Sequence, residues 1–183
     1  LGPDTAFCKN AAYTIRAGAN KGNYIWNNSS SSSDTLEVNS KGIYYVSITD
    51  ANACSNIDTI VIDTFEVPQF RDTTLNVLCK GDRTGSLYLD GIGGKPGYSF
   101  DWLVSSSNLS GMGNRVAQNL AAGSYKVTIT DANNCKDRTV FTITEPSKSV
   151  DVHIRTKRDV FCKSDSTGLV SVVALGGVSP YVY

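Results

Sequence analysis

The chain has 183 residues, in which 17 Lys and Arg side chains balance 17 Asp and Glu side chains to a formal net charge of zero. This balance argues against a nucleic-acid-binding surface or a polybasic membrane anchor, and no stretch reaches the roughly 18 apolar residues of a membrane helix. Strong helix formers are sparse in the periodic segments, so we expect an all-β protein. The first residue is Leu1 and not Met, which indicates a processed or truncated start.

The first predicted unit covers residues 1–66. Residues 24–26 place Trp26 on an inner strand. In residues 44–49 every second side chain is Tyr, Val or Ile, which is typical of a half-buried strand. The turn Asp-Ala-Asn at residues 50–52 then leads into a returning strand, so this part of the unit is a β-hairpin.

The second predicted unit, residues 67–146, repeats the first. The sequence Ile-Thr-Asp-Ala-Asn-Ala-Cys at residues 48–54 returns almost unchanged at residues 129–135, 81 residues later (135 − 54 = 81). Trp102 takes the place of Trp26. Periodic self-similarity of this length indicates a tandem array of domains.

A third unit, residues 147–183, begins in the same way. Cys162-Lys163 matches Cys79-Lys80, and residues 176–183 match residues 93–100 of the second unit. We therefore expect an incomplete third repeat with unpaired strand edges. Either these residues belong to a longer polypeptide, or another chain completes the sheet.

Proline-containing segments separate the predicted units. Glu66-Val67-Pro68 and Glu145-Pro146 follow the last strand of the first and second units. Proline removes a backbone donor and stiffens the junction. We interpret both segments as domain joints in a semi-rigid rod.

The two tryptophans and two tyrosines are the predicted core markers. Short strands around a central Trp, with a Gly-x-Tyr entry to the penultimate strand, favour immunoglobulin-like β-sandwiches. Trp26 and Trp102 are expected in the core. Tyr44 and Tyr125 are expected either as tyrosine corners or as ordinary core residues.

The cysteine count predicts about one disulfide in each complete repeat. The simplest pairing joins Cys8 to Cys54 and Cys79 to Cys135, and leaves Cys162 with a partner beyond the sequence. A standard sandwich, however, places Cys79 at the opposite end from the turn before Cys135. A bond between repeats or a different strand order therefore stays open, as do free thiols in a cytosolic protein.

No candidate catalytic group recurs in the repeats, so we predict a protein that is not an enzyme. The sole histidine, His153, lies in an alternating segment and is expected on a strand surface. Asp82 and Asp165 begin Asp-x-Thr-Gly turns that suggest a calcium loop, but each has a single carboxylate, and an Asp that caps its own turn explains the spacing. There is no Cys-x-x-Cys pair for zinc. We predict no metal and no cofactor.

The second unit resembles the SprB-type repeat of large Bacteroidota cell-surface adhesins, including those of gliding motility. The resemblance rests on four motifs: Cys-Lys-Gly-Asp-x-Thr-Gly-Ser at 79–86, Gly-Gly-x-Pro-x-Tyr-x-Phe-x-Trp at 93–102, the run from Leu to Cys at 120–135, and Ile-Thr-Glu-Pro at 143–146. The front of the first unit lacks the Asp-x-Thr-Gly turn and resembles immunoglobulin-like or PKD-like modules. The resemblance implies type IX secretion, surface exposure and long arrays.

The same lineage suggests O-glycosylation at Asp-Ser/Thr followed by a small or aliphatic residue. Thr5, Thr35 and Thr59 fit this pattern. Thr35 is the preferred candidate because it lies in a predicted loop.

We therefore predict an extracellular, non-catalytic stalk or fibre segment that presents or forms an adhesin. Its expected partners are neighbouring repeats or other fibre subunits and an unknown surface or glycan ligand, with no nucleic acid and no direct membrane span. One alternative is a filament subunit whose third domain is completed by a neighbouring chain. Another is a carbohydrate-binding module of an exported enzyme, which would need exposed aromatic side chains.

Overall fold

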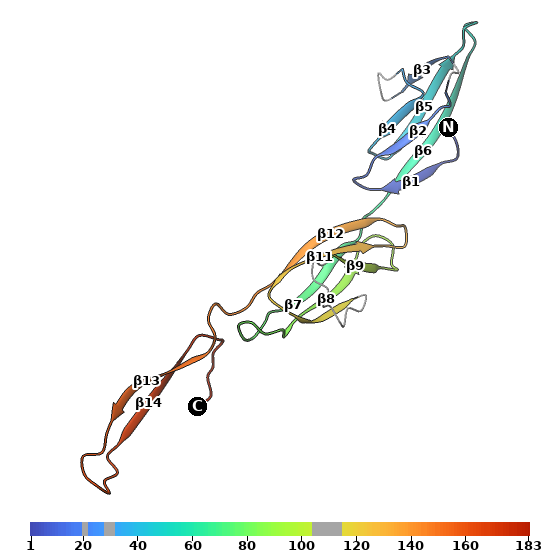
Figure 1. Cartoon of the computed structure of the whole chain (residues 1–183). Helices are drawn as coiled ribbons and strands as arrows, with labels where there is room; N and C mark the ends of the chain where they lie inside the picture. Colours follow the sequence, from blue (N-terminus) through green and yellow to red (C-terminus); the bar gives the residue numbers. More distant parts are fainter. Residues whose placement is uncertain (20–21, 28–31, 104–114) are drawn as a thin grey trace. The chain divides into compact units, whose positions relative to one another are not determined.

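The computed structural model describes residues 1–19, 22–27, 32–103 and 115–183 (Figure 1). These residues form fourteen strands and no helix, which confirms the predicted all-β class. No helix capable of crossing a membrane occurs in this part of the chain. The strands of the first sandwich are β1 (Thr5–Cys8), β2 (Tyr13–Arg16), β3 (Asn23–Trp26), β4 (Thr35–Val38), β5 (Gly42–Thr49) and β6 (Ser55–Phe65). Those of the second sandwich are β7 (Gln69–Leu75), β8 (Gly85–Ile92), β9 (Ser99–Leu103), β10 (Val116–Leu120), β11 (Gly123–Thr130) and β12 (Lys136–Ile143), and β13 (Asp151–Arg158) and β14 (Leu169–Leu175) follow.

The first sandwich has two sheets with the strand order of an immunoglobulin-like domain. One sheet has the order β1-β6-β5-β3, and β2 pairs with β4 in the other. The long hairpin of β5 and β6 forms the centre of the larger sheet (Figure 1). β1 joins the free edge of β6 in parallel, which places Cys8 beside Phe65. A two-sheet packing in which the Trp-bearing strand lies beside the last hairpin matches the immunoglobulin-like topology.

Alternating side chains of these strands fill the core between the two sheets. Trp26, Val46, Ile60 and Ile62 are each at most 2% exposed. Trp26 also donates its ring N–H to the backbone oxygen of Ser33 at 2.9 Å. The predicted period-two pattern therefore produces one buried face in each strand.

The second sandwich repeats this plan with one change in its first strand. Its sheets have the orders β10-β8-β7 and β12-β11-β9. β7 thus lies beside β8, whereas β1 of the first sandwich lies beside β6. Its core contains Leu87, Val127 and Ile129, none of which is measurably exposed.

Each sandwich contains a tyrosine corner. The Tyr44 hydroxyl donates to the backbone oxygen of Ser40 at 2.9 Å, and the Tyr125 hydroxyl donates to that of Ala121 at 2.8 Å. Both rings are buried. Each tyrosine therefore fills both roles expected from the sequence, as a tyrosine corner and as a core residue. This contact is a hallmark of immunoglobulin-like sandwiches.

The chain forms two compact units whose borders differ from those of the sequence repeats. The first unit contains residues 1–69 together with residues 92–98 and 130–137, and the second contains residues 70–91, 99–129 and 138–183. Two loops of the second sequence repeat therefore belong to the first compact unit. The division into units 1–66, 67–146 and 147–183 stays a prediction.

The last two strands form a hairpin with an open apolar face. β13 and β14 pair in antiparallel register, with Ile154 opposite Val172 and Val152 opposite Ala174. Val152, Ile154 and Val172 are 58%, 64% and 42% exposed, and only Ala174 is buried. A single hairpin has no second sheet to cover this face.

Candidate functional site

The β5–β6 and β11–β12 hairpins end in the same carboxylate-capped turn. Asp50 accepts hydrogen bonds from the backbone N–H groups of Asn52 and Cys54 at 2.8 and 2.9 Å. Asp131 accepts the corresponding bonds from Asn133 and Cys135, both at 2.9 Å. The fourth turn residue has positive φ in each copy, 64° in Ala53 and 62° in Asn134. This geometry agrees with the turn role expected for the two Asp-Ala-Asn sequences.

Asp131 has a further role that Asp50 lacks. Asp50 is exposed, whereas Asp131 is only 4% exposed. The second carboxylate oxygen of Asp131 accepts the backbone N–H of Lys95 at 2.9 Å, and Ala132 N–H donates to Lys95 O at 3.2 Å. Asp131 therefore joins the hairpin to the loop of residues 92–98 within the first compact unit.

Gly94 and Pro68 complete this packing. Gly94 has φ of +57°, and a Cβ atom at this position would lie 2.5 Å from Asp131 Oδ2 and 3.0 Å from the nitrogen of Pro68. Pro68 is fully buried. The Gly-Gly sequence therefore permits a backbone approach that a side chain would block. The sequence showed Gly93-Gly94 only as part of a repeat motif and gave no sign of the contact with Asp131.

A disulfide lies at the same place. Cys8, at the end of β1, is bonded to Cys135, which is fully buried just before β12. Their Cα atoms are 5.5 Å apart, within the usual range for a disulfide. We call the group of Cys8, Pro68, Gly94, Lys95, Asp131 and Cys135 the hairpin junction. It links the opening turn of the first sequence repeat to the hairpin of the second.

The simplest expected cysteine pairing is therefore wrong. Cys8 lies beside Phe65 at one end of β6, while Cys54 precedes Ser55 at the other end. About 11 residues of strand at ~3.3 Å each separate the two positions by roughly 36 Å, far beyond disulfide reach. Cys79 and Cys135 are separated in the same way along β12, because Val77 N–H donates to Thr144 O beyond the far end of that strand. The bond between repeats, left open by the sequence, is the one that forms.

The three remaining cysteines, Cys54, Cys79 and Cys162, are exposed and form no disulfide in the structure. Cys79 and Cys162 open turns that match the turn of Cys8. The third turn residue has positive φ in each, 68° in Asn10, 84° in Gly81 and 70° in Ser164. The backbone N–H of the fourth residue donates to the cysteine carbonyl in all three turns.

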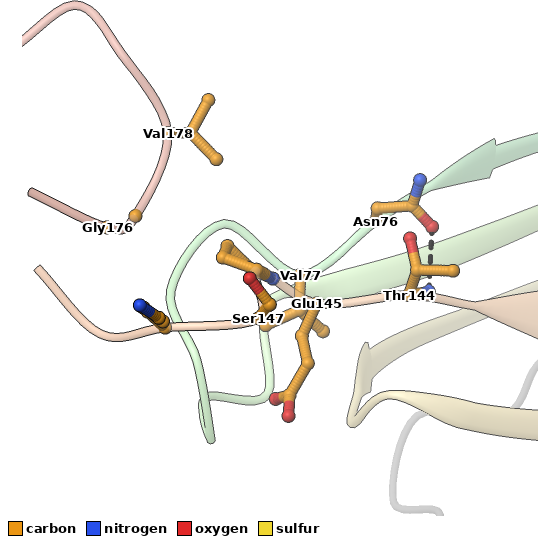
Figure 2. A pocket seen from close by; sticks show the side chains of 10 residues that line it. Asn76, Val77, Thr144, Glu145, Ser147, Gly176 and Val178 are labelled. Atoms are coloured by element: carbon orange, nitrogen blue, oxygen red, sulfur yellow. Dashed lines mark hydrogen bonds between the residues drawn. The ribbon is translucent and has the colours of Figure 1, made fainter.

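A pocket of about 460 Å³ lies beyond the end of β12, inside the second compact unit. Figure 2 shows Gly176 and Val178 on one side, with Asn76, Val77 and Thr144 across from them. Thr144 N–H donates to the Asn76 side chain at 2.9 Å. The turn after Cys79 contacts this lining, because Lys80 Nζ donates to Ser147 O at 2.9 Å and Gly81 N–H donates to Glu145 at 2.6 Å.

The other candidates from the sequence lie apart from these groups. His153 is exposed on β13, with Nε2 3.0 Å from Asp151 Oδ2. Asp165 accepts hydrogen bonds from Ser166 N–H and the Thr167 hydroxyl, as expected for a carboxylate that caps its own turn. No group of three or more metal-ligating side chains occurs among the residues described.

The predicted glycosylation sites differ in exposure. Thr5 and Thr35 begin β1 and β4 and are half-buried, whereas Thr59 is exposed on β6. Glycosylation of all three stays a prediction, and Thr59 is the most accessible of them. Trp26 is buried and Trp102 is half-buried.

The strand orders and tyrosine corners define a tandem array of immunoglobulin-like β-sandwiches. Within this array, residues 71–106 match the SprB repeat, which confirms the recognition of that repeat in the second unit. No curated protein matches the chain in sequence. The match to the SprB repeat and the fold support an extracellular adhesive repeat with a structural, non-enzymatic character.

Solved structures of low similarity also align with the chain. The N-terminal eight immunoglobulin domains of Down Syndrome Cell Adhesion Molecule share 11% identity at a TM-score of 0.48, over 78% of this chain and 26% of that chain. Extracellular domains 3–5 of Drosophila OTK share 16% identity at 0.40, over 77% and 58%. The insect immune protein hemolin shares 13% identity at 0.33, over 78% and 44%. The chain thus spans less than two thirds of each of these three chains.

Proposed function

We propose that this chain is a structural segment of a large extracellular adhesive protein, in which immunoglobulin-like repeats act as a stalk or fibre that presents or forms an adhesin. The observation that carries this proposal is the Cys8–Cys135 bond, which closes the chain covalently between the first repeat and the hairpin of the second. Disulfides persist in oxidising, extracellular surroundings. A bond between repeats limits how far they can separate, which suits a stalk or fibre.

The surface chemistry supports the same proposal. The chain carries no net charge, and the residues described hold no cluster of metal ligands. The proposed partners of the chain are neighbouring repeats of the same polypeptide or other subunits of a fibre. From the resemblance to the SprB-type repeat we also propose an origin in Bacteroidota, export by type IX secretion and a part in gliding motility.

Labelling of intact cells tests the proposal. An antibody raised against residues 1–146 should bind unpermeabilised cells that produce the protein, and surface proteolysis should remove the signal. An in-frame deletion of these residues should reduce attachment of the cells to glass or polystyrene. A signal that appears only after permeabilisation, with Cys8 and Cys135 reduced, would overturn the proposal.

A second candidate function is favoured by the open apolar face of β13 and β14. Val152, Ile154 and Val172 are exposed on one side of an isolated hairpin. In a filament subunit, a strand or domain from a neighbouring chain would cover this face. The denaturing mass of the native polypeptide separates the two functions, because a filament subunit would have a mass near 19.6 kDa and a repeat adhesin a much larger one.

A further inference from the structure

The hairpin junction contains one disulfide, between a cysteine that opens a turn and a cysteine that ends a hairpin turn. Each of the three unpaired cysteines occupies one of these two kinds of position. Cys79 and Cys162 open turns that match the turn of Cys8. Cys54 ends a carboxylate-capped turn that matches the turn of Cys135. The bond in the structure joins an opening cysteine of one repeat to the hairpin cysteine of the next.

The pocket beyond β12 has the same glycine pair and tyrosine contact as the hairpin junction, but among the residues described it has no counterpart of the β11–β12 hairpin. Gly176 and Gly177 have φ of 74° and 58°, close to the 68° and 57° of Gly93 and Gly94. Tyr181 donates its hydroxyl to Gly176 O, as Tyr98 does to Gly93 O. A Cβ atom on Gly94 would meet Asp131, whereas one on Gly177 would meet the side chain of Val150, the residue at the start of the third repeat. Gly176 and Gly177 also line the pocket.

The turn that Cys79 opens is hydrogen-bonded to residues that line this pocket. The two residues after Cys79, Lys80 and Gly81, are hydrogen-bonded to Ser147 and Glu145 of the lining. In the first repeat, Lys9 likewise bonds Glu66, at 3.0 Å. The opening turn is therefore fixed at the joint that follows its own repeat in both copies.

From these equivalences we propose that the pocket receives the Asp-x-Asn-x-Cys hairpin of the third repeat, and that the cysteine of this hairpin forms a disulfide with Cys79. The hairpin carboxylate would accept the backbone N–H of Val178, as Asp131 accepts that of Lys95. By the same rule Cys162 bonds the hairpin of a fourth repeat, and Cys54 bonds an opening cysteine of a preceding repeat. The inference rests on the proposed function, because it requires an oxidised array.

The bond forms by thiol–disulfide exchange with an oxidising protein disulfide or oxidised glutathione. One cysteine thiolate attacks the disulfide of the oxidant and releases its first thiol. The second cysteine thiolate then attacks the mixed disulfide and releases the second thiol. The two cysteines lose two electrons and two protons, and the oxidant gains them as two thiols.

Disulfide mapping of the native full-length protein tests the pairing. The protein is alkylated without reduction, digested, and its linked peptides are sequenced. The expected products are the Cys8–Cys135 peptide and a peptide that links Cys79 to a hairpin of the Asp-x-Asn-x-Cys type. Alkylation of Cys79 as a free thiol, or its linkage to Cys54, would overturn the inference. Surface labelling of the same cells separates this failure from failure of the proposed function.

A capture experiment on the 183-residue chain tests the pocket itself. The probe is a synthetic peptide of residues 126–138 whose Cys135 is activated as a mixed disulfide with 2-thiopyridine. Cys79 should be captured at least ten-fold faster than Cys162, because Cys162 has the same turn but belongs to the same repeat as Gly176 and Gly177, whereas Cys79 belongs to the repeat before them. A probe with Asp131→Ala should lose this preference. Equal rates at Cys79, Cys162 and Cys54 would overturn the proposed binding of the hairpin.

Discussion

Gly94 lies so close to the carboxylate of Asp131 that a Cβ atom on Gly94 would be 2.5 Å from Asp131 Oδ2. The glycine supplies the space and the aspartate fills it. Asp131 then binds three backbone N–H groups, those of Lys95, Asn133 and Cys135. The packing of the hairpin junction therefore depends on a residue without a side chain.

Substitution of Gly94 by alanine should destabilise the first compact unit by about 2–3 kcal/mol, because it adds a clash to a positive φ. Gly93→Ala is the matched control: its φ is +68°, but its nearest contact would be 3.6 Å away, at Val67 O. The control should cost about 1 kcal/mol for the backbone conformation alone. Urea unfolding followed by Trp26 fluorescence in a Trp102→Phe background measures both, and equal losses would refute the close approach.

Removal of the Asp131 carboxylate should have a larger effect than removal of its exposed counterpart. Asp131→Ala leaves three backbone N–H groups without their acceptor, of which that of Cys135 is buried, at an expected cost of about 2–4 kcal/mol. Asp50→Ala breaks two bonds at an exposed turn and should cost about 1 kcal/mol. The same fluorescence assay compares the two variants. Similar costs would show that the burial of Asp131 has no energetic consequence.

Loss of the disulfide should be the most destabilising of these changes. Cys8 and Cys135 are 127 residues apart, and a bond that closes a loop of this length contributes about 4–5 kcal/mol by the chain-entropy model. Cys8→Ser should therefore lower the unfolding midpoint strongly, and dithiothreitol should reproduce the change in the unsubstituted chain. Cys54→Ser, at an exposed unpaired position, should change stability by less than about 0.5 kcal/mol. A dithiothreitol effect that persists in Cys8→Ser would contradict the assignment.

The tyrosine corner of the second sandwich should make stability fall at alkaline pH. Burial raises the pKa of Tyr125 above its ordinary value, against the opposing effects of Arg83 and the bond to Ala121. A raised pKa means that the folded state holds the proton more tightly. This contribution is fully present below the unfolded pKa of about 10 and is lost as pH rises through the folded pKa.

The Tyr125→Phe variant isolates this contribution. At pH 7 it should lose about 1 kcal/mol with the hydrogen bond to Ala121, and its deficit relative to the unsubstituted chain should shrink between pH 10 and 12. Urea unfolding of thiol-alkylated protein at several pH values measures the difference. Tyr88→Phe, at an exposed position on β8, serves as the control. A deficit that stays constant over this range would exclude the titration of Tyr125.

Local patterns predicted much of the fold. The alternation over residues 44–49 indicated a central strand, and the Trp-bearing strands indicated a sandwich with an immunoglobulin-like order. These features depend on side-chain period and local turn chemistry, which are legible in a single sequence. The change in the first strand, where β1 joins β6 but β7 joins β8, has no comparable local signal.

The hairpin junction was only partly predictable. Asp50 and Asp131 lie in nearly identical sequences, yet one is exposed and the other is buried against Gly94 and Lys95. The difference arises from residues far away in the chain, so no local pattern distinguishes them. The cysteines gave a usable signal, because the sandwich topology already placed Cys79 far from its simplest partner.

The Cys8–Cys135 bond also has a mechanical consequence. A force applied to the two ends of the chain would pass through the S–S bond and bypass the residues between the two cysteines. At ~3.5 Å per extended residue, about 440 Å of backbone is withheld from stretching. If every opening cysteine is bonded to the hairpin of the next repeat, the oxidised array would lengthen very little under force. Reduction of these bonds would let it lengthen as its domains unfold.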